Sequence, residues 1–96
     1  MGSRATITTD QLLAAEEAKC ILYYYKAARV YGATHAEALA AHAAGCDLYD
    51  YSYGREYAAT HDETLAAHAE GCNLRKYAYA RDNGSTHAEA MIDCKR

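Results

Sequence analysis

Apolar and polar positions along the chain recur with a period of 26 residues. The segment over 34–45 reads THAEALAAHAAG, returns from Thr60 as THDETLAAHAEG, and opens again from Thr86 as THAEAM. Three copies align without a gap, over 20–45, 46–71 and 72–96. A half-unit over 8–19 precedes them, after a lead over 1–7 that we expect to be disordered. A fixed period of this length indicates stacked structural repeats within a single domain.

Each unit carries the start and stop signals of two short helices. Thr34 and Glu37 form a capping box, which recurs at Thr60 and Thr86 and, with Gln in place of Glu, at Thr8. Gly at positions 45 and 71 suits a helix end, and the Asp or Asn two residues later suits a new N-cap. The second helices are predicted over 48–57 and 74–83. The first copy has Lys-Cys-Ile at 19–21, so one longer helix over 8–31, or one with only a slight kink, is expected there.

The pattern therefore predicts an all-α fold, an α-solenoid-like stack of short helical hairpins with a 26-residue period. Leu48, Tyr51 and Arg55 share one face of their helix and have identical counterparts in every copy, which assigns them to the core between helices. Tyr49 and Tyr53 lie on roughly the opposite face, together with Tyr57.

The composition provides few large apolar side chains for this core. The chain of 96 residues has ten Tyr but no Phe or Trp, and much of its hydrophobic fraction of 51% is Ala. Such a small domain is marginally stable by itself, so we expect a homo-oligomer. The formal net charge of −3 makes nucleic acid an unlikely partner, since a nucleic-acid binder needs a basic face.

The sequence shows no signal peptide, and its longest apolar-looking run, over 20–25, is too short to span a bilayer. We therefore expect no membrane partner and a cytoplasmic, reducing location. In that setting the four Cys are predicted to be free.

The five His and four Cys raise the possibility of a metal site. His pairs within a helix are seven residues apart, too far for one helix to close a site, so ligands would have to come from neighbouring units as His42, His68 and Cys94. The competing interpretation places these His in a half-buried stripe, where they could also respond to pH. No copy holds an unusual acid, base and nucleophile set, so we expect neither an enzyme nor a cofactor.

A binding surface is the favoured functional interpretation. Tyr offers a large contact area with little entropy to lose, and Arg beside Tyr can bind anionic groups. The first hypothesis is a non-catalytic module that binds a protein or peptide. The alternatives are a sponge for a small anionic ligand between Tyr and Arg of adjacent units, and the His/Cys metal binder. The candidate binding residues are Tyr49, Tyr53, Tyr57, Tyr79, Arg55, Arg81, His35, His61 and His87.

The motif Gly-x-Thr-His-x-Glu followed by Gly-x-Asp-Leu-x-x-Tyr resembles the short 26-residue helical tandem repeats of actinobacteria and their phages. The resemblance covers residues 8–96 and implies no particular activity. An inhibitor or adaptor in a bacterium or phage is part of the first hypothesis, the binding module. The construction is also similar to tetratricopeptide and Sel1-like repeats, without their Trp and Pro marks, which implies protein or peptide binding by analogy of fold.

Overall fold

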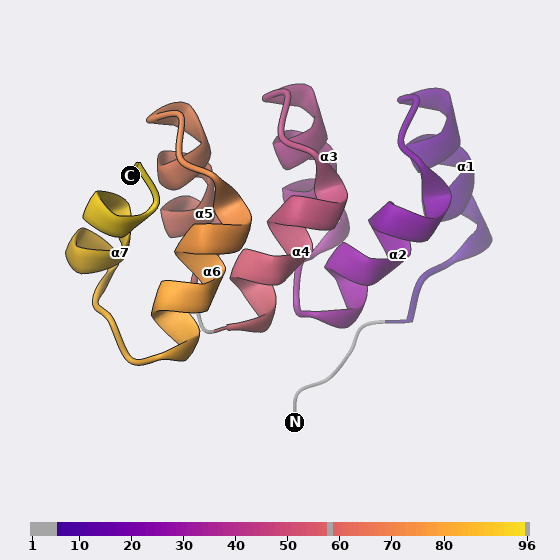
Figure 1. The fold of residues 1–96 in the computed structure, drawn as a ribbon. Helices are drawn as coiled ribbons and strands as arrows, with labels where there is room; N and C mark the ends of the chain where they lie inside the picture. Colours follow the sequence, from indigo (N-terminus) through magenta and orange to yellow (C-terminus); the bar gives the residue numbers. More distant parts are fainter. Residues whose placement is uncertain (1–5, 58, 96) are drawn as a thin grey trace.

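The computed structural model describes residues 6–57 and 59–95, and all regular structure within them is α-helical (Figure 1). The predicted all-α class is confirmed. None of the described helices is long and apolar enough to cross a membrane. In chain order the helices are α1 (Thr9–Glu17), α2 (Leu22–Val30), α3 (His35–Ala43), α4 (Leu48–Glu56), α5 (His61–Ala69), α6 (Leu74–Asp82) and α7 (His87–Asp93).

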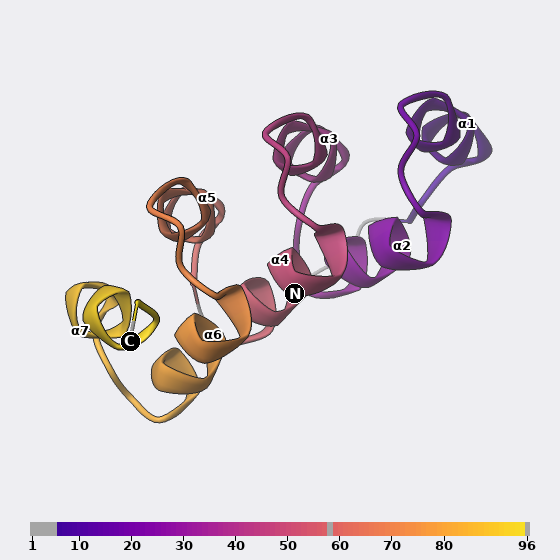
Figure 2. The ribbon, with the colours of Figure 1, turned by 45° about the horizontal axis from the view of Figure 1, so that its top comes forward.

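The helices form two rows (Figure 2). Helices α2, α4 and α6 pack side by side in an inner row, while α1, α3 and α5 form an outer row that rests on it. Helix α7 packs more closely on α6 than α5 does. The result is an elongated stack of 39 × 29 × 18 Å, and the predicted solenoid-like arrangement of hairpins is confirmed.

The predicted capping boxes start the outer-row helices. Thr34 Oγ1 accepts from the Glu37 backbone N–H at 3.1 Å, and the Glu37 carboxylate accepts from the Thr34 N–H at 3.0 Å. The same pair of bonds occurs at the starts of α1, α5 and α7. Asp47 caps α4 through the N–H groups of Tyr49 and Asp50, and Asn73 caps α6 in the same way. These caps satisfy backbone donors that a helix start would otherwise leave unpaired.

The expected single helix over 8–31 is wrong, because the chain turns at Lys19. This residue adopts a left-handed conformation with φ of 71°, where later units have Gly45 at 84° and Gly71 at 82°. The turn uses the same backbone bonds as those glycines: the Lys19 N–H donates to the Glu16 carbonyl and the Cys20 N–H to the Ala15 carbonyl, both at 3.0 Å. Burial of Ala15 and Cys20 fixes the turn, although the sequence carries no stop signal there.

Two parts of the prediction fall on residues that the structure does not describe. Residues 1–5, most of the predicted disordered lead, lie outside the described residues. Ile7, the last residue of that lead, packs against the hydrophobic core. Position 58, where the sequence has Ala in place of a turn Gly, also lies outside the described residues.

The core is built from one tyrosine per unit, surrounded by alanines. Tyr25, Tyr51 and Tyr77 are each 0% exposed, and Leu48 and Leu74 are buried beside them. The predicted Leu–Tyr–Arg core face is therefore confirmed for these residues. Burying aromatic rings compensates for the scarcity of large aliphatic side chains, since a buried ring removes a large apolar area from water.

The middle unit contains a matched exchange at the contact of α4 with α5. A Cβ added at Gly54 would lie 2.9 Å from side-chain atoms of Thr64. Both residues are buried, and Thr64 Oγ1 donates to the Thr60 carbonyl at 2.8 Å. The equivalent pairs in the first and third units are both Ala with Ala. A larger Thr on one helix is thus accommodated by the missing side chain on the other.

The prediction that all four cysteines are free is also wrong. Cys72 and Cys94 form a disulfide, with their Cα atoms 5.1 Å apart, while Cys20 and Cys46 are free and buried. The prediction rested on the expected reducing location. Cys94 occupies the position of His42 and His68, and the close packing of α7 on α6 brings it to the start of α6.

Replacing Lys19 by Gly is expected to stabilise the protein by about 1 kcal/mol, because Gly adopts the left-handed conformation without a steric penalty. The free energy of unfolding should be measured by urea denaturation. Lys19→Ala removes the same charge and side-chain length but keeps the strained backbone, so it serves as the control. Equal stabilisation by both variants would contradict this account of the turn.

Gly54→Ala is expected to destabilise the protein by about 1–3 kcal/mol, since the added methyl group overpacks the contact with Thr64. Combining it with Thr64→Ala reproduces the Ala–Ala pair of the other units and should recover most of that loss. Thermal and urea unfolding of both single variants and the double variant would give the coupling. Simple additivity of the two single changes would show that the close contact does not matter.

Candidate functional site

Each unit contains a hydrogen-bonded chain centred on its buried tyrosine. In the middle unit the Tyr51 hydroxyl lies 2.8 Å from His61 Nδ1 and accepts from an Arg55 Nη at 2.7 Å. The same Arg55 nitrogen donates to Glu37 Oε1 at 3.0 Å. Arg55 Nη2 also donates to the Gly32 carbonyl at 3.2 Å. The chain therefore joins the middle unit to the helix start of the unit before it.

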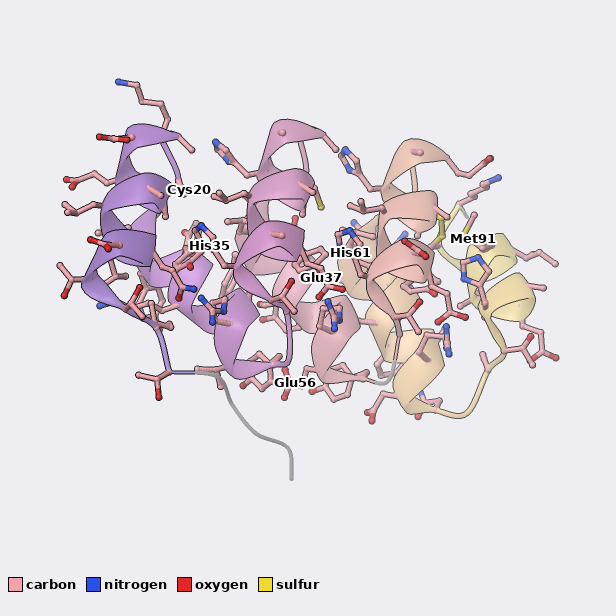
Figure 3. The ribbon with its side chains drawn as sticks, turned by 180° about the vertical axis from the view of Figure 1, so that it is seen from behind. Cys20, His35, Glu37, Glu56, His61 and Met91 are labelled. Carbon is pink, nitrogen blue, oxygen red and sulfur yellow. A yellow bond between two sulfur atoms is a disulfide. The ribbon has the colours of Figure 1, made fainter. Side chains whose placement is uncertain are left out.

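The same chain recurs in the other two units; Figure 3 labels His35 of the first unit's chain, and His61 and Glu37 of the middle unit's chain. Its distances differ by only about a tenth of an ångström from unit to unit. The third unit uses Tyr77, His87, Arg81 and Glu63, and the first uses Tyr25, His35, Arg29 and Gln11. Five of the predicted binding residues lie in these chains, namely Arg55, Arg81, His35, His61 and His87.

The buried hydroxyl has a polar partner on each side. Because a guanidinium can only donate, the Tyr51 oxygen accepts from Arg55, and its second partner is His61 Nδ1. His61 also packs edge-on against the Tyr51 ring, with centroids 5.9 Å apart. Each His thus completes the hydrogen bonding of a buried hydroxyl.

Electrostatics reinforce the ion pair at the end of the chain. Partial burial opposes ionisation of Glu37, but its bonds to the Thr34 N–H and to Arg55 prevail and hold its pKa below 4.5. For Glu63 the backbone bond from Thr60 is the main cause of the same lowering of the pKa. Burial raises the pKa of the Tyr51 hydroxyl, partly offset by Arg55. The glutamates are therefore charged partners and the tyrosines neutral ones at neutral pH.

The first unit lacks the carboxylate of this chain. Arg29 is only 5% exposed, and its polar partners include the Gln11 side chain at 2.9 Å and the Tyr25 hydroxyl at 2.7 Å. Its Nε has no hydrogen-bond partner within the described residues. A buried guanidinium held by neutral groups is less stable than one paired with a carboxylate. The hydrogen-bonded chain of the first unit is therefore electrostatically weaker than those of the middle and third units.

A second set of aromatic side chains lies outside the buried core, although Tyr24 packs against it. The Tyr24 ring stacks on Tyr49 with centroids 5.1 Å apart, and Tyr49 meets Tyr53 edge-on at 5.3 Å. Tyr23 also contacts Tyr24, with centroids 6.0 Å apart. Tyr79 occupies on α6 the position of Tyr53 on α4. We call Tyr23, Tyr24, Tyr49, Tyr53, Arg75 and Tyr79 the tyrosine face.

Arg75 and Asp50 belong to this region but were not predicted. The Arg75 Nε donates to Asp50 Oδ1 at 2.9 Å, and its guanidinium lies over the rings of both Tyr49 and Tyr53. The contact follows the same register as the stack of Tyr24 on Tyr49, since residues 50 and 75 lie 26 residues after 24 and 49. The sequence alone does not give this register, because it depends on which helix faces meet.

The four predicted tyrosines do not form one cluster. Tyr49 and Tyr53 touch each other and are half-buried, whereas Tyr79 is 71% exposed on α6. Tyr57 lies at the C-cap of α4, where neighbouring Glu56 raises its pKa. The structure thus brings together two of the four and leaves Tyr79 as the most exposed of them.

The alternative metal ligands bind other groups. His42 Nε2 lies 2.7 Å from the Ala18 carbonyl, and His68 Nε2 lies 3.2 Å from the Ala44 carbonyl. Cys94 is in the disulfide. Within the described residues, no three His, Cys, Asp or Glu side chains gather closely enough to hold a metal ion. The two His instead link the ends of neighbouring outer-row helices.

Two shallow grooves open between successive units, built from equivalent residues. The first, of about 320 Å³, includes Ile21, Tyr24 and Leu48. The second, of about 360 Å³, has Asp47, Asp50 and Leu74 at the equivalent positions and includes Arg75. Each is bounded by a His, and a buried Cys lies in its wall. The thiol in the first wall, Cys46, has its pKa raised to about 12 by burial and nearby Asp50 and Asp47, so it is not a reactive thiolate.

Comparisons of this chain with protein-family models, with curated proteins and with solved structures find no significant match. The geometry of the described residues therefore carries the functional argument.

Exchanging the acidic partner of the arginine should change stability in opposite directions in two units. Gln11→Glu supplies the missing carboxylate to buried Arg29 and is expected to stabilise the protein by about 1 kcal/mol. Glu37→Gln removes that charge from Arg55 and should destabilise it by a similar amount. Urea denaturation at neutral pH would measure both changes.

The matched control is Glu89→Gln, which alters the same capping position in α7. Glu89 makes the capping-box bonds but no ion pair within the described residues. It should therefore change the free energy of unfolding by less than Glu37→Gln does. Equal losses from the two variants would assign the effect to capping and not to the arginine.

Proposed function

We propose that this protein is a non-catalytic module that binds a protein or peptide through its tyrosine face. The observation that carries the proposal is the exposure of large aromatic side chains on the inner-row helices. Tyr23 and Tyr79 are 72% and 71% exposed. These large rings stay on the surface even though the core contains few large apolar side chains. Tyr is enriched where proteins bind one another, because it contributes a large area and few rotatable bonds.

The shape of this region supports a peptide as the partner. The tyrosine face runs across α2, α4 and α6, and both grooves open beside it through Tyr24, Asp50 and Arg75. A ligand that crossed several units would meet similar features at regular intervals. Repeat proteins commonly present such extended surfaces to peptides.

The hydrogen-bonded chains centred on the buried tyrosines favour this proposal over the small-anion sponge. Arg55 and Arg81 each donate to a glutamate and a tyrosine hydroxyl. An anionic ligand would have to displace a carboxylate already bound at 3.0 Å. The arginines and histidines of these hydrogen-bonded chains, called the core chains below, are therefore better explained as links between units than as a ligand site.

Other parts of the functional picture stay predictions. A role as an inhibitor or adaptor in a bacterium or phage is one of them. Self-association and a cytoplasmic location are likewise untested. Leu13 and Ile92, at opposite ends of the stack, are 52% and 59% exposed, which supports self-association through the stack ends.

Selection from a displayed random-peptide library against the immobilised protein tests the proposal. We expect enriched peptides whose affinity falls at least about tenfold for the double variant Tyr23→Ser with Tyr79→Ser, because exposed aromatic anchors commonly dominate binding. Glu17→Ser is the control. It alters an exposed residue of outer-row helix α1 and should leave the affinity unchanged. Peptides that bind the double variant as tightly as the unaltered protein would refute the tyrosine face as the site.

A further inference from the structure

Tyr49 and Tyr53 form an open corner on the surface of α4. Their ring planes meet at 74° with centroids 5.3 Å apart, and their hydroxyls are 3.2 Å from each other. The guanidinium carbon of Arg75 lies 5.4 Å from the Tyr49 centroid and 5.7 Å from the Tyr53 centroid. Both distances are within the roughly 6 Å at which an aromatic face attracts a cation. The corner therefore already holds an organic cation.

A carboxylate completes the corner. Asp50, on the same helix, accepts from Arg75 Nε at 2.9 Å. Two π faces and one carboxylate suit a planar guanidinium, which can lie against a ring and donate a directed hydrogen bond at the same time. A compact ammonium cannot do both as well. The chemistry of the corner thus points to arginine rather than to lysine.

The present occupant is held loosely. The Arg75 side chain is 60% exposed and that of Asp50 is 34% exposed. Exposed ion pairs and cation–π contacts are weak and compete readily with water and with other cations. Arg75 also comes from the next unit, on α6, so its side chain can swing into solvent without any change in α4.

The corner has no counterpart at the preceding unit boundary. There the equivalent contact is the stack of Tyr24 on Tyr49, which has no charge. The core chains recur in every unit, whereas this cation contact occurs between the second and third units. A contact needed only to join units would be expected to recur as the core chains do.

We propose that Tyr49, Asp50 and Tyr53 form a binding site for an arginine side chain of a partner peptide, which Arg75 occupies when no partner is bound. The inference rests on the proposed binding function of the tyrosine face and names the chemistry of its ligand. The partner's guanidinium replaces that of Arg75 by non-covalent exchange. The groove that contains Ile21 and Leu48 lies beside Tyr24 and offers apolar contacts to the neighbouring residues of the peptide.

The variant Arg75→Ala empties the corner and makes the site measurable. The probe is the tripeptide acetyl-Gly-Arg-Gly-amide, titrated while backbone amide spectra are recorded by NMR. We expect shifts centred on residues 49–53 and a Kd on the order of millimolar, as for a single exposed contact. The unaltered protein should bind about twofold more weakly, because tethered Arg75 competes at a millimolar effective concentration, close to the Kd of the contact itself.

Three controls separate this site from general charge attraction. Adding Asp50→Asn to Arg75→Ala should weaken binding at least about fivefold, since a charged acceptor is lost. Adding Glu17→Gln instead, which removes an exposed charge from outer-row helix α1, should leave it unchanged. The lysine tripeptide should bind more weakly than the arginine one. Circular dichroism of each variant establishes that the fold is retained.

Two results would overturn the inference. One is the absence of saturable shifts at residues 49–53 in folded Arg75→Ala, and the other is equal binding by the variant that also carries Asp50→Asn. These outcomes are distinct from failure of the proposed function. Library peptides that depend on Tyr23 and Tyr79 but contain no arginine would keep the tyrosine face as a binding surface and reject the arginine site.

Discussion

The stack depends on a glutamate carboxylate that binds in two directions. Glu37 accepts from the backbone N–H of Thr34, which starts its own helix, and from Arg55 of the following unit. Glu63 repeats this arrangement with Arg81. Local helix formation and packing between units are therefore coupled through one group. A helix that starts at the correct residue also places its carboxylate where the next unit's arginine can reach it.

Much of this fold follows from the sequence, because its local signals agree with one another. Capping boxes, turn glycines and the Leu–Tyr–Arg face all predict the same helices, and the observed ends differ from the prediction by about one residue. The failure at Lys19 has a different origin. There the burial of Ala15 and Cys20 and the backbone bonds of the turn outweigh the local preference of the residue. Such tertiary effects have no signature in a single segment.

The candidate site was only partly predictable for a similar reason. Equivalent positions reveal what each unit needs for itself, and they identified the Tyr, Arg and His of the core chains. They do not reveal contacts between different positions of neighbouring units. The pairing of Arg75 with Asp50 and the disulfide of Cys72 with Cys94 are both of this second kind. They required knowledge of which helix faces meet.

The polar side-chain links between the described units join residues at most 25 apart in the chain. No such link reaches beyond the adjacent unit, so the contact order is low and each interface forms without waiting for distant parts of the chain. Stability then accumulates along one dimension, unit by unit. The extent of the exposed aromatic surface is governed by the same rule. Its length is set by the number of units, so evolution can lengthen or shorten it by whole repeats while each interface keeps its geometry.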